Sequence, residues 1–224
     1  MILDLDLKNK QVVIVGGGPE AHRKIISFLD AGSKILVVSQ NFLDEIHNLH
    51  ELKKIELCQK NIKDANSFIG SFKQVPDVLV AVTNDHELNA QLVKRAKTAG
   101  SMVYAVDNTK ISDFMLPALA KIDDVRIAVS TSGKSPSMAR VLRQRIEKMI
   151  TKQDLLQIKL QEYVRGELKQ MIPDQKIRKI VMTEILQDTH IQKMLKKGDM
   201  DQAKQFALDI TKSFQEPTTN HTEG

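Results

Sequence analysis

The sequence predicts an α/β protein with a doubly wound parallel sheet, and three observations carry this prediction. Short runs of apolar, mostly β-branched residues recur along the first half of the chain, with helical stretches between them. The runs are apolar at nearly every position, which is typical of strands that helices cover on both faces. A glycine turn follows the first run directly, as in the strand–turn–helix units of such sheets.

Five runs are the predicted strands of this sheet: "QVVIVG", "KILVVS", "KIELCQ", "PDVLVAVT" and "SMVYAV". Ala31-Gly32 ends the first connecting helix, because glycine commonly follows the last helical residue. Asn84-Asp85 precedes a later helix that closes at Gly100. The turn residues and the apolar runs therefore predict the same boundaries.

The pattern changes after about residue 113. The runs "LPALAKID" and "VRIAVSTS" flank the Asp123-Asp124 turn, which predicts an antiparallel pair of strands. A helix then begins with Ser135 as N-cap and Pro136 as its first residue. From about residue 153 the chain is predicted to be helical, with an interruption at Pro173 and two or three helices beyond it. The tail 215–224 has little to bury and is expected to be disordered.

Composition excludes several classes of protein. The chain has 42% hydrophobic and 27% charged residues, and no apolar run approaches the roughly 20 residues of a membrane span. The start "MILDLDLKNK" lacks a basic leader, so we expect a cytoplasmic protein without a membrane anchor. The net charge of +5 indicates an anionic partner, but only 4% of residues are aromatic, which disfavours nucleic acid.

No metal site is predicted. Cys58 is the only cysteine, so neither a disulfide framework nor a thiolate zinc site is expected. His47 and His50 lie near Cys58 in the sequence, but a fourth donor at suitable spacing is missing. We therefore expect Cys58 to be a buried thiol.

The stretch "VVIVGGGPEAHRK" contains the dinucleotide fingerprint G-x-G-x-x-A at Gly16, Gly18 and Ala21. Gly16 would allow the tight turn, Gly18 would let a pyrophosphate approach the amides of the helix, and Ala21 would permit close packing. The alternative is a glycine turn without a ligand, but the strand before it and the helix after it favour dinucleotide binding. The predicted cofactor residues are Gly16, Gly17, Gly18, Pro19, Glu20, Ala21, Ser39, Thr83 and Asn84.

The identity of the dinucleotide depends on the end of the second strand. Ser39 stands where an acidic residue often binds the ribose of NAD, and no arginine follows to favour a 2′-phosphate. NAD is therefore preferred over NADP. Thr83 and Asn84 end the fourth strand and are expected to lie beside the nicotinamide half.

A second polar turn, "STSGKSP", precedes a basic helix. Gly133-Lys134-Ser135 is similar to the end of a P-loop, but Ala128 occupies the position of the first glycine, so a P-loop is rejected. A capped turn with a lysine suits carboxylate or phosphate groups, although an ordinary capped turn is the alternative. The predicted substrate-binding residues are Ser132, Gly133, Lys134, Ser135 and Arg140.

Four stretches in register resemble the precorrin-2 dehydrogenase family of siroheme synthesis, some members of which are also sirohydrochlorin ferrochelatases. They are "VVIVGGGPEAHRK", "AVTNDHELN", "YAVDNTKISDFMLPA" and "RIAVSTSGKSPSMARVLRQRIE", and the resemblance covers about residues 1–150. It implies a Rossmann-type NAD-binding domain (1–112), a small central α+β dimerisation region (113–152) and a helical C-terminal domain (153–214). Thr131 and Lys134 depart from the family pattern, which more often has serine or glycine and a neutral residue there.

The resemblance also implies a reaction, the oxidation of precorrin-2 to sirohydrochlorin by a homodimer that uses NAD. The functional aspartate of the family falls on Asp107, just past the fifth strand. A carboxylate there can accept the proton that leaves with the hydride, although a turn-forming aspartate is the alternative from the residues alone. Insertion of ferrous iron or cobalt into the product stays open, as does a non-catalytic NAD-binding sensor.

Overall fold

The computed structural model describes residues 2–214, which fall into two compact units. The first unit ends at Leu116 and the second begins at Pro117. The domain boundaries expected from the sequence, 1–112, 113–152 and 153–214, stay predictions, and the predicted disordered tail 215–224 lies outside the described residues.

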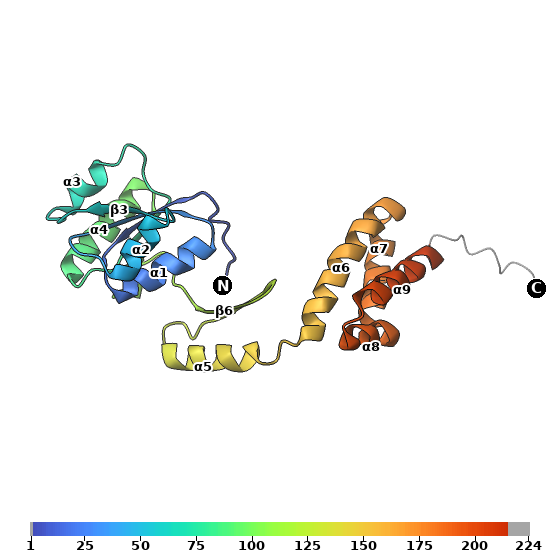
Figure 1. Ribbon diagram of the computed structural model, residues 1–224. Coiled ribbons are helices and arrows are strands. Elements are labelled where there is room, and N and C mark those ends of the chain that lie inside the picture. Colours follow the sequence, from blue (N-terminus) through green and yellow to red (C-terminus); the bar gives the residue numbers. More distant parts are fainter. Residues whose placement is uncertain (1, 215–224) are drawn as a thin grey trace, which may run out of the picture. The chain divides into compact units, whose positions relative to one another are not determined.

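The first unit is a parallel five-stranded sheet between helices (Figure 1). Its strands lie in the order β3-β2-β1-β4-β5, and every neighbouring pair is parallel. In chain order the elements are β1 (Gln11–Val15), α1 (Pro19–Asp30), β2 (Lys34–Ser39), α2 (Asp44–Glu51), β3 (Glu56–Gln59), α3 (Ala65–Gly70), β4 (Val78–Ala81), α4 (His86–Ala99), β5 (Met102–Ala105) and the short 3₁₀ turn η1 (Thr109–Ile111). The predicted doubly wound sheet is confirmed.

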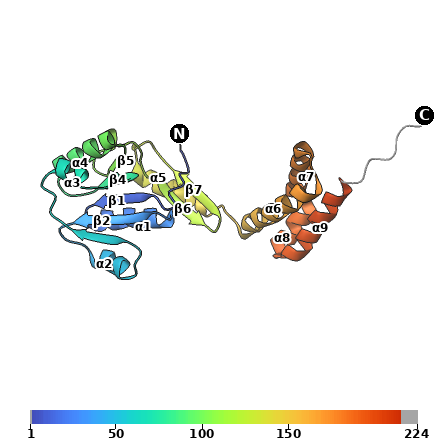
Figure 2. The same ribbon diagram turned by 90° about the horizontal axis from the view of Figure 1, so that it is seen from above.

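Both faces of the sheet are buried, which explains why the strands are apolar throughout. All four residues of β4 are buried. Leu79 and Ala81 pack into one core with α3 and α4, while Val78 and Val80 pack into the other with α1 and α2. Figure 2 shows the two pairs of helices on opposite faces of the sheet. Alternate side chains of one strand therefore serve two separate cores.

The helices in this unit begin and end at the capping and glycine residues predicted from the sequence. Asp85 is the N-cap of α4 and accepts from the amide of Leu88 at 2.9 Å. Gly100 ends α4 in the left-handed conformation, with φ of +104°, as glycine does at helix ends. Gly32 follows α1 with φ of +76°. These three predicted boundaries are confirmed.

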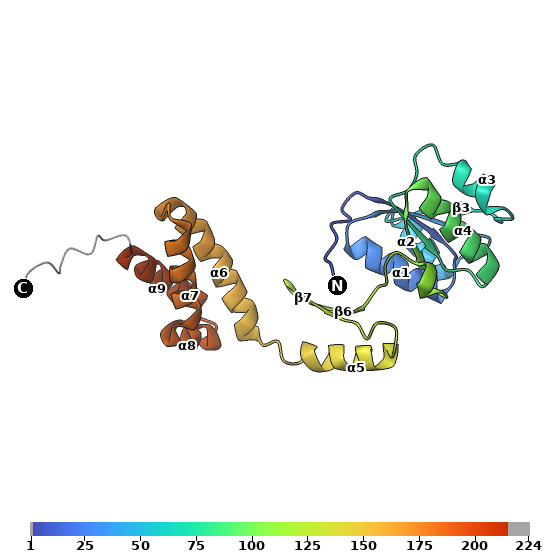
Figure 3. The same cartoon turned by 180° about the vertical axis from the view of Figure 1, so that it is seen from behind.

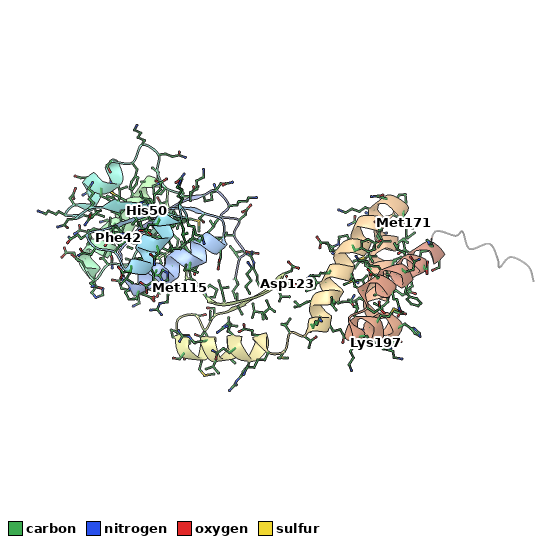
Figure 4. The ribbon with its side chains drawn as sticks, in the orientation of Figure 1. Phe42, His50, Met115, Asp123, Met171 and Lys197 are labelled. Atoms are coloured by element: carbon green, nitrogen blue, oxygen red, sulfur yellow. The ribbon has the colours of Figure 1, made fainter. Side chains whose placement is uncertain are left out.

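The second unit begins with the predicted antiparallel pair, β6 (Ala118–Ile122) and β7 (Val125–Val129). Asp123, labelled in Figure 4, has φ of +51° in the turn between them. Helix α5 (Pro136–Glu147) packs on both strands. Its N-cap is Ser135, whose hydroxyl accepts from the amide of Met138 at 3.3 Å, so the predicted helix start is confirmed.

The second unit continues with the helices α6 (Lys152–Met171), α7 (Gln175–Gln187), α8 (Thr189–Lys197) and α9 (Met200–Ser213). They pack together around one apolar core (Figure 3) that includes Leu160, Leu168 and Ile191. Figure 4 marks Met171 and Lys197 at the ends of α6 and α8. Helix α6 ends before Pro173 as predicted, and three helices follow in the described part of the chain. No helix among residues 2–214 is long and apolar enough to cross a membrane.

Candidate cofactor and active site

The topology of the sheet places a crevice beside the end of β1. β1 pairs with β2 on one side and with β4 on the other, through Val15↔Val38 and Val15↔Ala81. The strand order therefore reverses at β1: β2 and β3 lie on one side of it, and β4 and β5 lie on the other. Open parallel sheets bind ligands at the carboxyl ends of the strands where the order reverses. The glycine turn, Gly16 to Gly18, lies here between β1 and α1.

Two of the three glycines are required by packing within the protein. Gly16 has φ of +138°, and a Cβ there would lie 2.5 Å from the carbonyl oxygen of Val82. A Cβ on Gly17 would lie 2.0 Å from the carbonyl oxygen of Asn41. The carbonyl of Gly17 also accepts from the amide of Leu43 at 3.0 Å. These two positions bring the turn close to the ends of β4 and β2.

Gly18 differs, because no described atom lies within 4 Å of the position that its Cβ would take. It is the N-cap of α1, has no side chain to cap the helix, and is followed by Pro19. The first amides of α1 therefore face open space at the positive end of the helix dipole. This arrangement fits a pyrophosphate group. Ala21 is fully buried beneath the turn, where a small residue allows close packing.

A cavity of about 650 Å³ lies in this crevice, within the size range of small-molecule and cofactor sites. It contains all the predicted cofactor residues except Ala21, which packs below it. The remaining lining residues follow the ends of β1, β2, β3 and β4 or belong to α4: Val15, Val38, Gln40, Asn41, Phe42, Leu43, Lys60, Asn61, Ile62, Val82, Asp85 and Leu88. The segments 40–43 and 60–62 were missed from the sequence, although each follows a strand whose carboxyl end faces the crevice.

The part of the cavity near the end of β2 carries no carboxylate among its described residues. Ser39, Gln40 and Asn41 follow one another there, and the amide group of Gln59 donates to the carbonyl of Gln40 at 3.0 Å. Lys60 adds a cation to the lining. Hydroxyl and amide groups, together with the ammonium of Lys60, are thus the hydrogen-bonding side chains available to a ribose at this end.

The end of β4 is held by one buried side chain, Asn89 of α4. Asn89 is 1% exposed. Its Oδ1 accepts from the amide and the hydroxyl of Thr83 at 3.1 and 2.7 Å, and its Nδ2 donates to the carbonyl of Thr83 at 3.0 Å. Three hydrogen bonds therefore fix the backbone that leads to Asn84. Thr83 was predicted from the sequence as a cofactor residue, whereas Asn89, which holds its backbone, was not.

Asp107 lies two residues beyond the end of β5, next to this network. Ala105 pairs with Ala81. Asp107 and Thr83 each come two residues after one member of this pair, so both stand at the carboxyl ends of neighbouring strands. The Asp107 side chain is 18% exposed, and its Oδ2 is hydrogen-bonded to Nδ1 of His86. Asp107 itself is outside the set of described residues that line the cavity. It stands at the end of the neighbouring strand.

The environment of Asp107 keeps the carboxylate charged. Burial acts to raise the pKa of Asp107, but hydrogen bonds from the side chains of His86 and Asn89 and the charge of His86 outweigh it, so the pKa lies below its ordinary value. At neutral pH the group is an anion that can accept a hydrogen bond or a proton. His86 and Asn89 both belong to "NDHELN", a stretch from which sequence reasoning selected only Asn84.

The predicted substrate-binding residues lie in the second unit: Ser132 to Ser135 stand between β7 and α5, and Arg140 lies within α5. Ser132 and Gly133 have φ of +53° and +78° and form a tight turn. The amide of Lys134 donates to the carbonyl of Thr131 at 3.0 Å, and Ser135 caps α5. Lys134 and Arg140 are exposed. Their role in substrate binding stays a prediction.

No group of three or more histidine, cysteine or acidic side chains within residues 2–214 is arranged to hold a metal ion. Cys58 was expected to be buried and is half-buried, packed against the core under α3 and α4. His50 (Figure 4) instead forms a hydrogen bond through Nδ1 with the carbonyl of Ile55 at 3.0 Å. His47 packs edge-on against the ring of Phe42.

Strand order, glycine turn and cavity together define a dinucleotide-binding protein of the Rossmann type. A family model described as "Putative NAD(P)-binding" matches residues 3–118, and one described as "Sirohaem biosynthesis protein central" matches residues 124–149. The chain belongs to this NAD(P)-binding family, that of precorrin-2 dehydrogenases and siroheme synthases. The resemblance seen in the sequence is confirmed.

Two of the similar proteins are named as siroheme synthase and precorrin-2 dehydrogenase. The chain is 36% identical to "Siroheme synthase" of Nitrosomonas europaea over 148 residues, 65% of this chain and 30% of that protein. It is 29% identical to "Putative precorrin-2 dehydrogenase" of Methanocaldococcus jannaschii over 199 residues, 86% of this chain and 93% of that protein. The chain spans less than half the length of the siroheme synthases that it matches.

A solved structure, "SirC, precorrin-2 dehydrogenase", has the same fold. It superposes with a TM-score of 0.74 at 21% sequence identity and covers 93% of this chain and 99% of its own. At this identity the likeness concerns the fold alone. It extends beyond the sheet to the helical part of the chain, for which the sequence analysis found no motif.

Proposed function

We propose that this protein oxidises precorrin-2 to sirohydrochlorin with NAD as hydride acceptor. The observation that carries the proposal is the Asp107 carboxylate, held by hydrogen bonds with His86 and Asn89 at the end of β5, beside the strand end that lines the glycine-turn cavity. The names of the relatives support the same reaction.

The residues have separate tasks in this reaction. The nicotinamide supplies a hydride acceptor when it is bound. The open position at Gly18 and the first amides of α1 would hold the pyrophosphate, while the fixed backbone of Thr83 sets the wall at the other end of the cavity. Loss of a hydride from the substrate leaves one proton to be removed, and Asp107 accepts it on its carboxylate.

A non-catalytic NAD-binding sensor is the alternative from another class. It would need the glycine turn as much as an enzyme does. It gives no reason for a carboxylate that is 18% exposed and fixed by donors from α4, because burial of a charge has a cost that a sensor would not need to meet. The Asp107 network therefore favours the enzyme.

The decisive experiment is anaerobic incubation of the protein with precorrin-2 and NAD. NADH absorbance and the tetrapyrrole spectrum should change together. Asp107→Asn, which keeps the shape of the side chain, should lower kcat about 100-fold or more, whereas Asp30→Asn at the far end of α1 should leave it unchanged. A folded wild-type protein that forms no NADH refutes the oxidoreductase, and a fully active Asp107→Asn refutes the role of Asp107.

The finer identity of the cofactor is also a proposal. Ser39, Gln40 and Asn41 offer hydrogen bonds to a ribose but no arginine for a 2′-phosphate, so we propose NAD rather than NADP. Lys60 in the lining is the one feature that favours a phosphate. The ratio of kcat/KM for the two cofactors measures this preference, and a ratio that favours NADP contradicts the assignment.

We further propose that the protein is a cytoplasmic homodimer. Apolar side chains are exposed on β6 and α5: Leu119, Met138, Val141 and Ile146, with Met149 just beyond α5. A second copy that covers them would account for such a surface, and the family resemblance implies dimerisation through residues 113–152. Light scattering should give twice the mass of the chain, and Leu119→Lys should shift it toward the monomer.

Metal insertion by the same protein is left to experiment. Addition of ferrous iron or cobalt to the sirohydrochlorin formed, followed by the loss of its free-base spectrum, measures chelation directly. Asp107 would again be the proton acceptor, because protons leave the pyrrole nitrogens as a metal enters. An unchanged rate of insertion in Asp107→Asn would separate chelation from this carboxylate.

A further inference from the structure

The contact between His86 and Asp107 adds a side-chain hydrogen bond to the direct packing of α4 on β5. His86 is the first residue of α4, and Asp107 follows β5. The Asp107 carboxylate can only accept, so Nδ1 of His86 carries the proton in their hydrogen bond. The imidazole is 81% exposed and the carboxylate 18%. The ring is thus the more exposed member of the pair.

The polar side chains next to His86 on α4 have other hydrogen-bond partners, so they do not compete with Asp107 for its Nδ1–H. Asp85 is occupied as the N-cap of α4 and accepts from the amide of Leu88. Glu87 accepts from the side chain of Gln91 at 3.3 Å, one turn along the helix. Asn89 is neutral and is fixed to Thr83.

A surface ion pair that contributes only to stability is the plain alternative. Exposed pairs are worth about 0–1 kcal/mol, and the exposure of His86 fits that description. Asp107 differs from such a pair, because its side chain is 18% exposed and a partly covered carboxylate is held by hydrogen-bond donors. His86 and Asn89 provide these donors from the same helix.

We propose that His86 is a positioning residue: its Nδ1–H donates to Oδ2 of Asp107 and holds that carboxylate ionised and fixed in direction at the ends of β4 and β5. This inference rests on the proposed function, in which Asp107 accepts the substrate proton. The hydrogen bond needs no charge on the imidazole, because Nδ1 carries its proton whether or not Nε2 has one. His86 thus supports Asp107 in both of its own charge states.

The test compares two substitutions of His86. His86→Leu removes the donor, whereas His86→Asn places an amide donor near the position of Nδ1. We expect His86→Leu to lower kcat about 10- to 100-fold, as loss of positioning does, with little change in KM for NAD. His86→Asn should recover most of the rate. An unchanged kcat in His86→Leu overturns the proposal.

A matched histidine gives the control. His190 is also exposed, lies in the first turn of α8 and stands near the capping aspartate Asp188, at 3.7 Å. His190→Leu should leave kcat at the wild-type value. An equal loss in His190→Leu and His86→Leu would mean a general structural effect and would overturn the proposal.

A second measurement needs no substrate. Because the hydrogen bond from His86 lowers the pKa of Asp107, the carboxyl carbon of Asp107 should titrate at higher pH in His86→Leu than in wild type, followed by carbon NMR. The acid limb of kcat should move in the same direction. An unchanged titration overturns the pairing while the proposed function stands. A wild-type protein without NADH formation overturns the function, and the role of His86 with it, whatever the titration gives.

Discussion

The α-carbon of Gly16 lies directly against the carbonyl of Val82, so closely that a Cβ would come within 2.5 Å of its oxygen. The contact joins the end of β1 to the end of β4, the two strands that flank the cavity. Positive φ at Gly16 adds a second reason for glycine. The turn is therefore shaped by the sheet before any ligand binds.

Gly16→Ala is expected to destabilise the protein. The left-handed conformation costs roughly 1–2 kcal/mol for an alanine, and the clash with Val82 adds about 1–3 kcal/mol, as overpacking does. Urea unfolding should therefore show a loss of about 2–5 kcal/mol. A variant as stable as wild type would show that the backbone of the turn relaxes easily.

Gly18→Ser should leave stability almost unchanged but weaken the binding of NAD. Serine is a good N-cap, and no described atom lies where its Cβ would stand, so stability should stay within about 0.5 kcal/mol of wild type. The side chain would fill the space that we assign to the pyrophosphate. We expect the Kd for NAD to rise at least about tenfold, or 1.4 kcal/mol, by calorimetry. Unchanged binding would place the pyrophosphate elsewhere.

Asn89→Leu tests the network at the end of β4. The substitution removes three hydrogen bonds to Thr83 and leaves its part-buried amide and carbonyl without these partners, at a cost of up to about 1–3 kcal/mol for each such group. Unfolding free energy should fall by roughly 2–4 kcal/mol, and kcat should fall because Asp107 also loses a donor. Gln91→Leu on the exposed face of α4 is the control, and an equal loss there would contradict this explanation.

Much of the fold could be predicted because each signal was local. The apolar run from Val78 to Val82 predicts a strand covered on both faces, and Asp85 and Gly100 mark the ends of α4 without any tertiary information. Helix α2 had no such mark, because its N-cap is Leu43, without a side-chain hydrogen bond. Helix α3 has six residues, too few for a helical period to stand out.

The site was predicted less completely, for a physical reason. Gly16 and Gly18 stand in a fingerprint whose spacing follows from one turn of chain. His86 and Asp107 are 21 residues apart and meet through tertiary structure, the pairing of β4 with β5 and the packing of α4 on β5, so no spacing rule connects them. Gly17 is similar, because its need for glycine comes from Asn41 on another loop.

The stability of the first unit should depend on pH through Asp77. This carboxylate accepts from the amide of Gln11 at 2.8 Å and from Nζ of Lys10 at 3.0 Å, and these two hydrogen bonds lower the pKa of Asp77. A carboxyl whose pKa is depressed by folding stabilises the folded state above its unfolded pKa, and this contribution is lost as the pH falls through the folded value.

Asp77→Asn should therefore be less stable than wild type at about pH 7, and the difference should shrink below about pH 4, near the unfolded pKa of aspartate. Urea midpoints measured across this range give the test. Asp30→Asn is the control, because a carboxylate at the C-terminal end of α1 opposes the helix dipole and its removal should change stability slightly in the opposite direction. A difference for Asp77→Asn that stays constant with pH would mean that the Asn side chain, rather than the lost charge, causes the destabilisation.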